Sequence, residues 1–166
     1  MMLCRHRHGT APLLLIPLLL SACGLQPMYA GGGNGGVAQG LAAVSVPAIE
    51  GEAGWLVRNA LIDRLGTGTP RYRLDVRLDD RLQGLGLLSD DAISRERRTL
   101  RARYQLVEIA TGEVLLDASA GSDAGIDVVS SEYATIAAER TALENLSREV
   151  AERIVTRLSL KLRNPK

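Results

Sequence analysis

The sequence predicts an α+β fold, a two-layer sandwich in which two helices pack on one face of a four-stranded, mostly antiparallel sheet. Apolar residues recur at helical spacing in residues 52–65 and again from residue 131 to near the C-terminus. Between these segments, apolar and polar residues alternate with the period of a strand. Because apolar helix stripes and an apolar sheet face bury each other, the expected order is β-α-β-β-β-α, with the other sheet face polar.

The N-terminal segment is typical of a bacterial lipoprotein signal peptide. Arg5 and Arg7 precede an apolar run over residues 11–20, and two small residues then lead to Cys23. The run is too short for a transmembrane helix, which takes roughly 20 residues. We therefore interpret residues 1–22 as a cleaved signal peptide and Cys23 as the lipidation site, where acyl chains such as palmitate hold the protein at a membrane.

The residue after Cys23 indicates the destination of the protein. Gly24 stands where lipoproteins retained in the inner membrane carry Asp, so we expect a lipid-anchored protein on the periplasmic face of the outer membrane. The alternative is an ordinary signal peptide that ends beside a cysteine by chance.

The expected mature chain lacks the side chains of several catalytic mechanisms. His6, His8 and Cys4 all lie in the signal peptide, so no imidazole and no thiol other than that of Cys23 is left. This excludes Ser-His-Asp and Cys-His nucleophiles and a Cys/His zinc site. With 18 basic and 19 acidic residues, the mature charge also gives no reason to expect nucleic acid as a partner. We predict no catalytic residue, no metal and no cofactor.

The first elements follow a glycine-rich stretch. Residues 23–40 are expected to form the lipidated cysteine and a flexible linker, which leaves residues 41–166 as a single domain. Residues 41–47 form a short apolar run that ends at proline, and this predicts the first strand. Residues 52–65 follow as a helix, which ends at Gly66.

Three strands are expected next. Residues 71–79 alternate most clearly, and residues 99–109 repeat the pattern more loosely. Thr111 and Gly112 then turn the chain into a hairpin partner over residues 114–118. One face of the first of these strands is apolar and consists of Tyr72, Leu74, Val76 and Leu78.

The remaining segments are interpreted as connections and a final helix. Residues 81–91 mix glycines with leucines and predict a long apolar loop that covers or contacts something. Residues 119–131 form a polar, glycine-containing stretch. Ser131 caps the expected last helix and Glu132 suits its first turn.

Arginine is concentrated in the predicted sheet, with nine arginines between Arg71 and Arg103. One interpretation is a solvated face with cross-strand Arg–Asp pairs among residues 73–79. The other is a surface for an anionic group or a partner protein, because arginine suits bidentate phosphate contacts. The stretch 95–98 is the best local cluster. The candidate contacts to such an anionic group or partner protein are Arg95, Arg97, Arg98, Arg101 and Arg103.

Other motifs have ordinary structural interpretations. Asp79-Asp80 and Asp90-Asp91 lack metal-loop spacing and are expected to be turn residues. The stretch 84–86, Gly-Leu-Gly, is too short for a phosphate loop. Trp55 and Met28 are expected to be packing residues.

Several short motifs resemble one known family. The stretch 23–29, Cys-Gly-Leu-Gln-Pro-Met-Tyr, is similar to the opening Cys-Gly-Phe-x-Pro-Leu-Tyr of the lipopolysaccharide-assembly lipoprotein family LptE in its alphaproteobacterial form, with Leu25 and Met28 as departures. The resemblance covers nearly all of the mature chain. Further matches are Tyr72-Arg73-Leu74, Ser94-Arg95, Tyr104-Gln105-Leu106, Thr111-Gly112 and Ser131-Glu132-Tyr133-Ala134.

The resemblance implies a function as well as a fold. The family packs two helices on a four-stranded sheet and is not enzymatic. Its members plug the lumen of the outer-membrane β-barrel LptD, help it to fold and assist lipopolysaccharide delivery, and lipopolysaccharide binding is also described for them. We therefore expect an LptD-like barrel and lipopolysaccharide as partners.

Two alternatives stay open at this point. One is an auxiliary lipoprotein of an envelope lipid-transport system that binds a hydrophobic ligand. The other is a carboxylate-dependent hydrolase that would use Asp79 or Asp91, since that chemistry needs no histidine.

Overall fold

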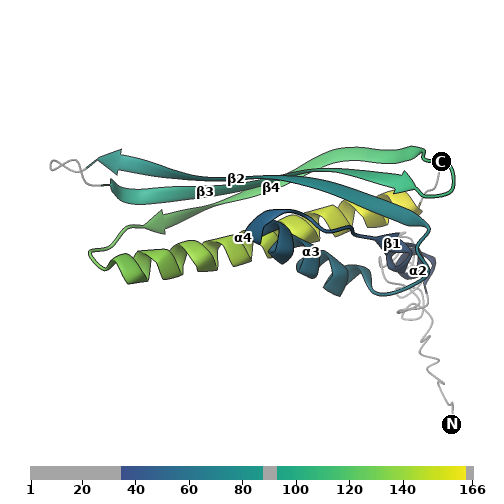
Figure 1. Ribbon diagram of the computed structural model, residues 1–166, viewed down its shortest axis with the longest axis horizontal. Helices are drawn as coiled ribbons and strands as arrows, with labels where there is room; N and C mark the ends of the chain where they lie inside the picture. The colour runs from purple at the N-terminus through teal and green to yellow at the C-terminus, as the bar shows by residue number, and fades with distance from the viewer. Residues whose placement is uncertain (1–34, 88–92, 164–166) are drawn as a thin grey trace, which may run out of the picture.

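The computed structural model describes residues 35–87 and 93–163, which form a long sheet lying over a layer of helices (Figure 1). The expected signal peptide, Cys23, Met28 and the Asp90-Asp91 pair lie outside the described residues. Along the chain the elements are α2 (Gly36–Ala42), β1 (Val44–Ser45), α3 (Gly51–Leu65), β2 (Tyr72–Leu87), β3 (Ile93–Glu108), β4 (Val114–Asp127) and α4 (Glu132–Arg163).

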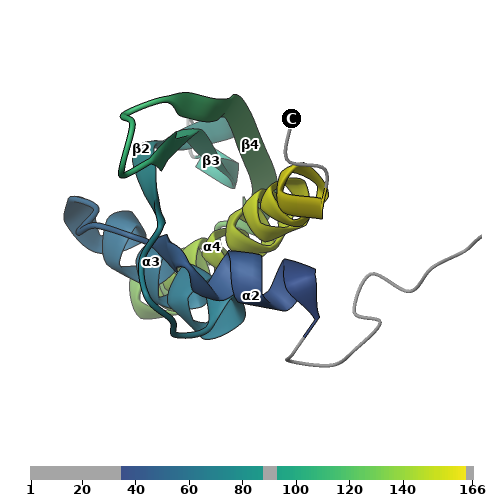
Figure 2. The same cartoon turned by 90° about the vertical axis from the view of Figure 1, so that its right-hand side faces the viewer.

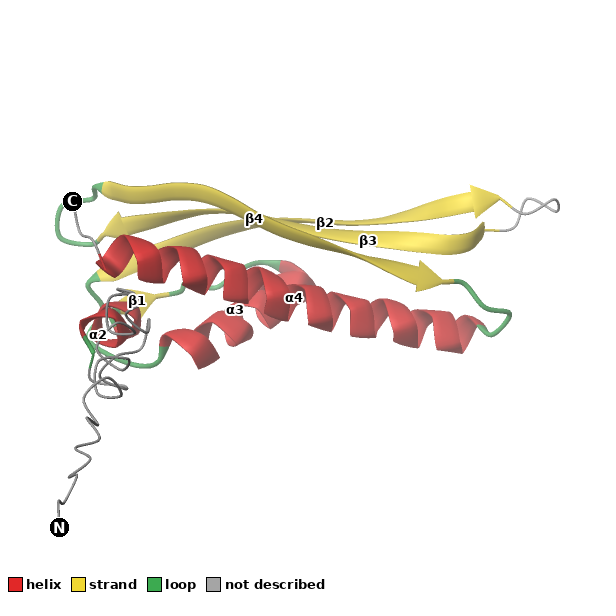
Figure 3. Ribbon diagram, turned by 180° about the vertical axis from the view of Figure 1, so that it is seen from behind, coloured by secondary structure: helices red, strands yellow, loops and turns green. Residues whose placement is uncertain are grey.

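The sheet confirms the predicted α+β class and its mostly antiparallel pairing. Its strand order is β1-β2-β3-β4. β1 pairs with β2 in parallel, whereas β2 with β3 and β3 with β4 are antiparallel. The three helices of the described residues all lie on one side of the sheet, and no described element covers its other face (Figure 3).

The strands are longer than the sequence predicted. The expected loop is wrong over residues 81–87, which continue β2, and the expected polar stretch is wrong over residues 119–127, which continue β4. Glycine and serine weaken the strand pattern there, but antiparallel pairing supplies hydrogen bonds for the whole length. The β2–β3 pairing runs from Tyr72 opposite Glu108 to Leu87 opposite Ile93.

The start of the domain also differs from the prediction. Residues 36–40, expected as linker, belong to helix α2, and the first strand is reduced to Val44–Ser45. Leu41 is buried in the last turn of α2, and Gly40 lies in contact with Leu162 of α4. Because α2 packs on the C-terminal part of α4, the domain begins earlier than composition indicated.

α4 runs almost the full length of the sheet, under β3 and β4, and α3 lies beside it (Figures 1 and 2). The helix can approach β4 closely because the inward residues of that strand are small, namely Ala118, Ala120, Ser122 and Ala124. The core between the layers is apolar. Its fully buried side chains include Leu61, Leu74, Leu100, Leu106, Leu143, Leu146, Ile154 and Leu158.

One tight backbone approach fixes the start of α3. A Cβ atom at Gly54 would lie 2.5 Å from the carbonyl oxygen of Ile49, so only glycine fits there. At the other end, Gly66 has φ +81, a conformation that side-chain-bearing residues rarely adopt, and it ends the helix as predicted.

We predict that truncation in the shared core costs far more stability than truncation at the surface of the same helix. Leu158 is fully buried, so Leu158→Ala should lower the free energy of unfolding by about 2–5 kcal/mol. Leu160, two residues on and 43% exposed, is the matched control, and Leu160→Ala should cost less than about 1 kcal/mol. Urea unfolding of both variants measures this, and equal losses would contradict the packing described here.

Candidate functional site

The open face of the sheet carries most of the charged side chains of the strands. Directly paired residues of neighbouring strands share a face, so the pairings define which charges lie together. We call this set the charged sheet face. It consists of Arg73, Asp75, Arg77, Asp79 and Arg81 on β2, Arg95, Arg97, Arg101 and Arg103 on β3, and Asp117, Asp123 and Asp127 on β4.

Ion pairs on β2 run along the strand. Arg73 Nε lies 2.9 Å from Asp75 Oδ1, and Arg81 Nη2 lies 2.8 Å from Asp79 Oδ2. Arg–Asp pairs therefore form, as predicted. These two pairs, however, join residues two apart on the same strand and do not cross between strands. The hydrogen bond to Asp75 raises the pKa of Arg73.

Between β3 and β4 the pairs do cross from strand to strand. Arg95 Nε lies 3.0 Å from Asp127 Oδ1, and Arg103 Nη2 lies 3.2 Å from Asp117 Oδ2. Gln105 donates a second hydrogen bond to Asp117, at 2.9 Å. These two donors, Gln105 first, lower the pKa of Asp117. A longer contact of 4.0 Å joins Arg97 and Asp123.

Two arginines of the charged sheet face have no hydrogen bond or ion pair among the described residues, and these are Arg77 and Arg101. Arg77 lies directly opposite Arg103, and like charges in that position are unfavourable. A depression of about 440 Å³ opens between Arg77, Arg101 and Arg103, and Asp79, which pairs with Arg81, also lines it. The arrangement suits an incoming anionic group.

Arg77 was expected to take part in the Arg–Asp pairs of residues 73–79, and within the described residues that expectation is wrong. It was not among the candidate contacts, although the pattern contained the signal. Residues 73–81 alternate three arginines with two aspartates on one face. When each aspartate pairs with the arginine at one end of the row, the middle arginine is left over.

Arg98 lies on the opposite face of the sheet from the other predicted arginines. The expectation that residues 95–98 form one cationic cluster is wrong, because alternate residues of β3 point to opposite faces. Arg98 points toward the helices, where its Nη2 lies 2.6 Å from Asp80 Oδ2, and the two side chains are only 16% and 25% exposed. Its Nη1 also donates to the carbonyl oxygen of Glu139 on α4. The hydrogen bond with Asp80 raises the pKa of Arg98, so the guanidinium stays protonated, and the Asp80 carboxylate balances its charge within the fold.

Glu96 lies on the same inward face as Arg98. Its Oε2 atom is shielded from solvent and has no hydrogen-bond partner in the structure. Burial, followed by the nearby Glu139 carboxylate, raises the pKa of Glu96. The pair joins β3 to the N-terminal part of α4, and it is most favourable when one carboxyl carries a proton.

The fold accounts for the positions of the other residues that the sequence singled out. Asp79 and Asp80 lie inside β2 rather than in a turn, on opposite faces, and each pairs with an arginine. The stretch 84–86 is also strand. Trp55 was expected to be a packing residue, but it lies on α3 with 64% of its surface exposed. Asp79, which the hydrolase hypothesis would use as a catalytic carboxylate, forms an ion pair with Arg81.

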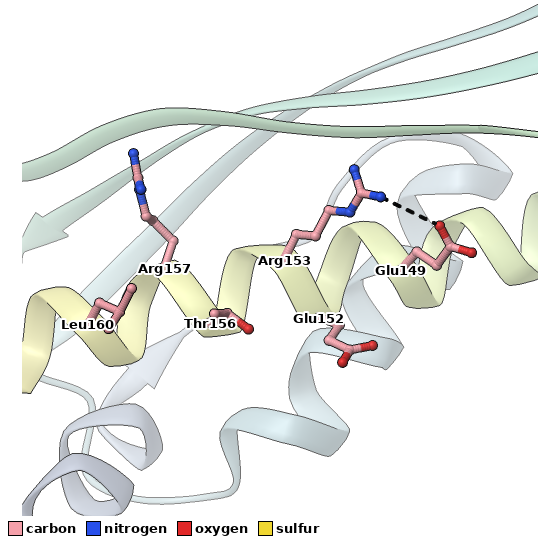
Figure 4. A pocket seen from close by; sticks show the side chains of 6 residues that line it. All are labelled: Glu149, Glu152, Arg153, Thr156, Arg157 and Leu160. Carbon is pink, nitrogen blue, oxygen red and sulfur yellow. Dashed lines mark ion pairs between the residues drawn. The ribbon is translucent and has the colours of Figure 1, made fainter. Parts of the chain in front are cut away.

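A second depression, of about 490 Å³, lies along α4 beside β4 (Figure 4). Arg153 and Arg157 point from α4 toward the strand, and Arg153 contacts both Glu149 and the carbonyl oxygen of Gly121. Ser122 of β4 donates a 2.6 Å hydrogen bond to Glu149. These charges join the helix to the strand edge and so serve the fold.

The described residues provide no grouping of three or more His, Cys, Asp or Glu side chains that could hold a metal ion. Within the same ranges, no helix has the length and apolar character needed to cross a bilayer. The described residues form a two-layer α+β sandwich that presents the charged sheet face.

Comparison with known proteins supports this class. A crystal structure of a protein from Caulobacter crescentus CB15 is 27% identical, with TM-score 0.65, over 80% of this chain and 98% of that one. The minor lipoprotein from Acinetobacter baumannii (14% identity, TM-score 0.54, 70% of this chain and 88% of that one) and rare lipoprotein B from Shewanella oneidensis (12%, 0.51, 74% and 96%) share the fold. No curated protein matches the chain.

The family itself is shown by the sequence. The family LptE, described as lipopolysaccharide-assembly, matches residues 41–158. The chain belongs to the LptE family, as its motifs indicated, and this membership gives it a role in lipopolysaccharide assembly.

We predict that Glu96→Gln flattens the pH dependence of stability. A carboxyl whose pKa is raised on folding contributes stability below its ordinary value of 4.5, and that contribution is lost as the pH rises through the raised pKa. Gln cannot ionise, so the variant should be more stable than the wild type by about 1 kcal/mol at pH 7, with a smaller difference at pH 4. Urea unfolding at both pH values measures this. A variant less stable at pH 7 would show that ionised Glu96 is favourable.

Proposed function

We propose that this LptE-family protein is a non-enzymatic outer-membrane lipoprotein that docks in the lumen of an LptD-like β-barrel. There it would assist assembly of the barrel and delivery of lipopolysaccharide to the cell surface. Acylation of Cys23 would hold it on the periplasmic face. The observation that carries the proposal is the family match over residues 41–158.

The dimensions of the domain support docking in a membrane-spanning barrel. At about 1.5 Å per residue, the 32 residues of α4 make a rod of roughly 48 Å. A bilayer with its headgroups is about 40–45 Å thick. A plug of this length would extend through the lumen from one side to the other.

The chemistry of the charged sheet face also fits such a site. Guanidinium and carboxylate groups favour a hydrated, polar wall over lipid tails. Arg95, Arg97, Arg101 and Arg103 all lie on this face, and we propose that they contact the barrel wall or lipopolysaccharide phosphates. Arg98 is left out of this set because Asp80 neutralises it on the other face.

Co-purification and depletion test the role in assembly. Full-length protein solubilised from envelopes should bring with it a large β-barrel, and depletion should lower both mature barrel and surface lipopolysaccharide. Recovery of a periplasmic or ABC-type partner instead would favour the auxiliary lipid-transport alternative. Normal levels of barrel and surface lipopolysaccharide after depletion would reject the proposal.

The arginine contacts have a separate test. The double variant Arg101→Ser/Arg103→Ser should weaken binding of purified lipopolysaccharide about tenfold or more, since charge-assisted hydrogen bonds contribute about 1.5–3 kcal/mol each. Arg64→Ser, an exposed arginine on α3, is the matched control and should bind as the wild type does. Dephosphorylated lipopolysaccharide should not distinguish the double variant from the wild type. Equal affinity of all three proteins for the intact glycolipid would place the contact elsewhere.

A further inference from the structure

β2 has an open side along most of its length. The strand has 16 residues, but on the side away from β3 the described part of the chain pairs with only Tyr72 and Arg73, through Val44 and Ser45 of β1. The chain leaves this edge at Pro47, which has no N–H group to continue the ladder. From residue 74 onward, nothing in residues 35–87 and 93–163 pairs with that side of β2.

The backbone groups that face this edge can be identified. The N–H of Tyr72 donates to the carbonyl oxygen of Ala43, and its own carbonyl oxygen accepts from Ser45 Oγ. Because backbone groups alternate sides along a strand, those of Leu74, Val76 and Leu78 face the same edge. They form a row of donors and acceptors, which is the template that an added strand recognises.

The side chains along this edge are different on its two faces. Toward the helices, Val76 and Leu78 are only partly buried where they pack on the core, and so are Leu56 of α3 and Ile49 just before it. On the open face, Arg77 has no hydrogen bond or ion pair within residues 35–87 and 93–163, and it is opposed by Arg103. An incoming strand would thus meet an apolar strip on one face and, on the other, an arginine whose neighbours Asp75 and Asp79 pair with Arg73 and Arg81.

The opposite edge of the sheet is less available. The carbonyl oxygen of Gly121 in β4 already accepts a hydrogen bond from Arg153, and Arg157 also points from α4 toward that strand (Figure 4). Such side chains block strand addition. The contrast favours β2.

We propose that the edge of β2 over residues 74–82 binds an extended segment of a partner protein as an additional strand. The segment carries apolar side chains at alternate positions, facing Val76 and Leu78. Between them it carries an acidic side chain beside Arg77, which offsets the repulsion between Arg77 and Arg103. This inference rests on the backbone and charges of β2 and is independent of the proposed function.

Site-specific photo-crosslinking in intact envelopes tests the pairing. A photoreactive amino acid replaces Asp75, Asp79 or Gln83, one at a time, in the full-length chain, which leaves Arg77 in place. We expect all three to cross-link to one segment of one polypeptide, with the linked position moving by four residues at each step. Thr99 and Gln105 lie on the same face but on the central strand, and cross-linking from them should be at least fivefold weaker.

Charge reversal tests the acidic partner residue. Arg77→Glu should reduce cross-linking from position 79 about tenfold. Arg64→Glu reverses an exposed arginine on α3, away from the charged sheet face, and should change this cross-linking less than twofold. Circular dichroism confirms that both variants are folded.

Several outcomes would overturn the inference. These are linked positions without the four-residue step, equal cross-linking from Thr99, products that contain only a second copy of this chain, and products that contain only lipid. A stepped pattern on a partner that is not a β-barrel would support strand addition while contradicting the proposed function.

Discussion

The contact between α4 and the sheet is the constraint on which the rest of the structure depends. A 32-residue helix buries its apolar stripe beneath β3 and β4, and the small inward residues of β4 allow its close approach. This contact covers one face of the sheet, so the side chains on the other face do not pack against the described helices. The charged sheet face exists because α4 and its companions already bury the apolar side chains of the strands.

Sequence periodicity was sufficient for the class and order of the elements, since helices and strands with one apolar side bury each other in few ways. It failed where the pattern weakened. Residues 81–87 and 119–127 contain glycine, serine and alanine, so they lacked a local strand signal and took their conformation from pairing with β3. Residues 36–40 are glycine-rich as well, and only their packing against α4 makes them helical.

The arginines were found from the sequence, but their grouping was not. Proximity in the sequence placed Arg97 beside Arg98, whereas the alternation of strand faces separates them across the sheet. Arg98 then pairs with Asp80, a residue of another strand, and no local pattern reveals such a partner. The strand register places Arg77 directly opposite Arg103, a neighbour that the sequence alone did not reveal. Register depends on how two strands align, which composition does not encode.

The helix layer is uneven along the sheet. α2 and α3 both lie toward the C-terminal part of α4, whereas the first turns of α4 extend past α3 and leave Tyr133 84% and Ile136 55% exposed (Figure 1). Fewer buried contacts mean that local opening costs less free energy at this end of the molecule. We therefore expect backbone amides in the first turns of α4 to exchange with solvent faster than those in the turns that pack against α2 and α3.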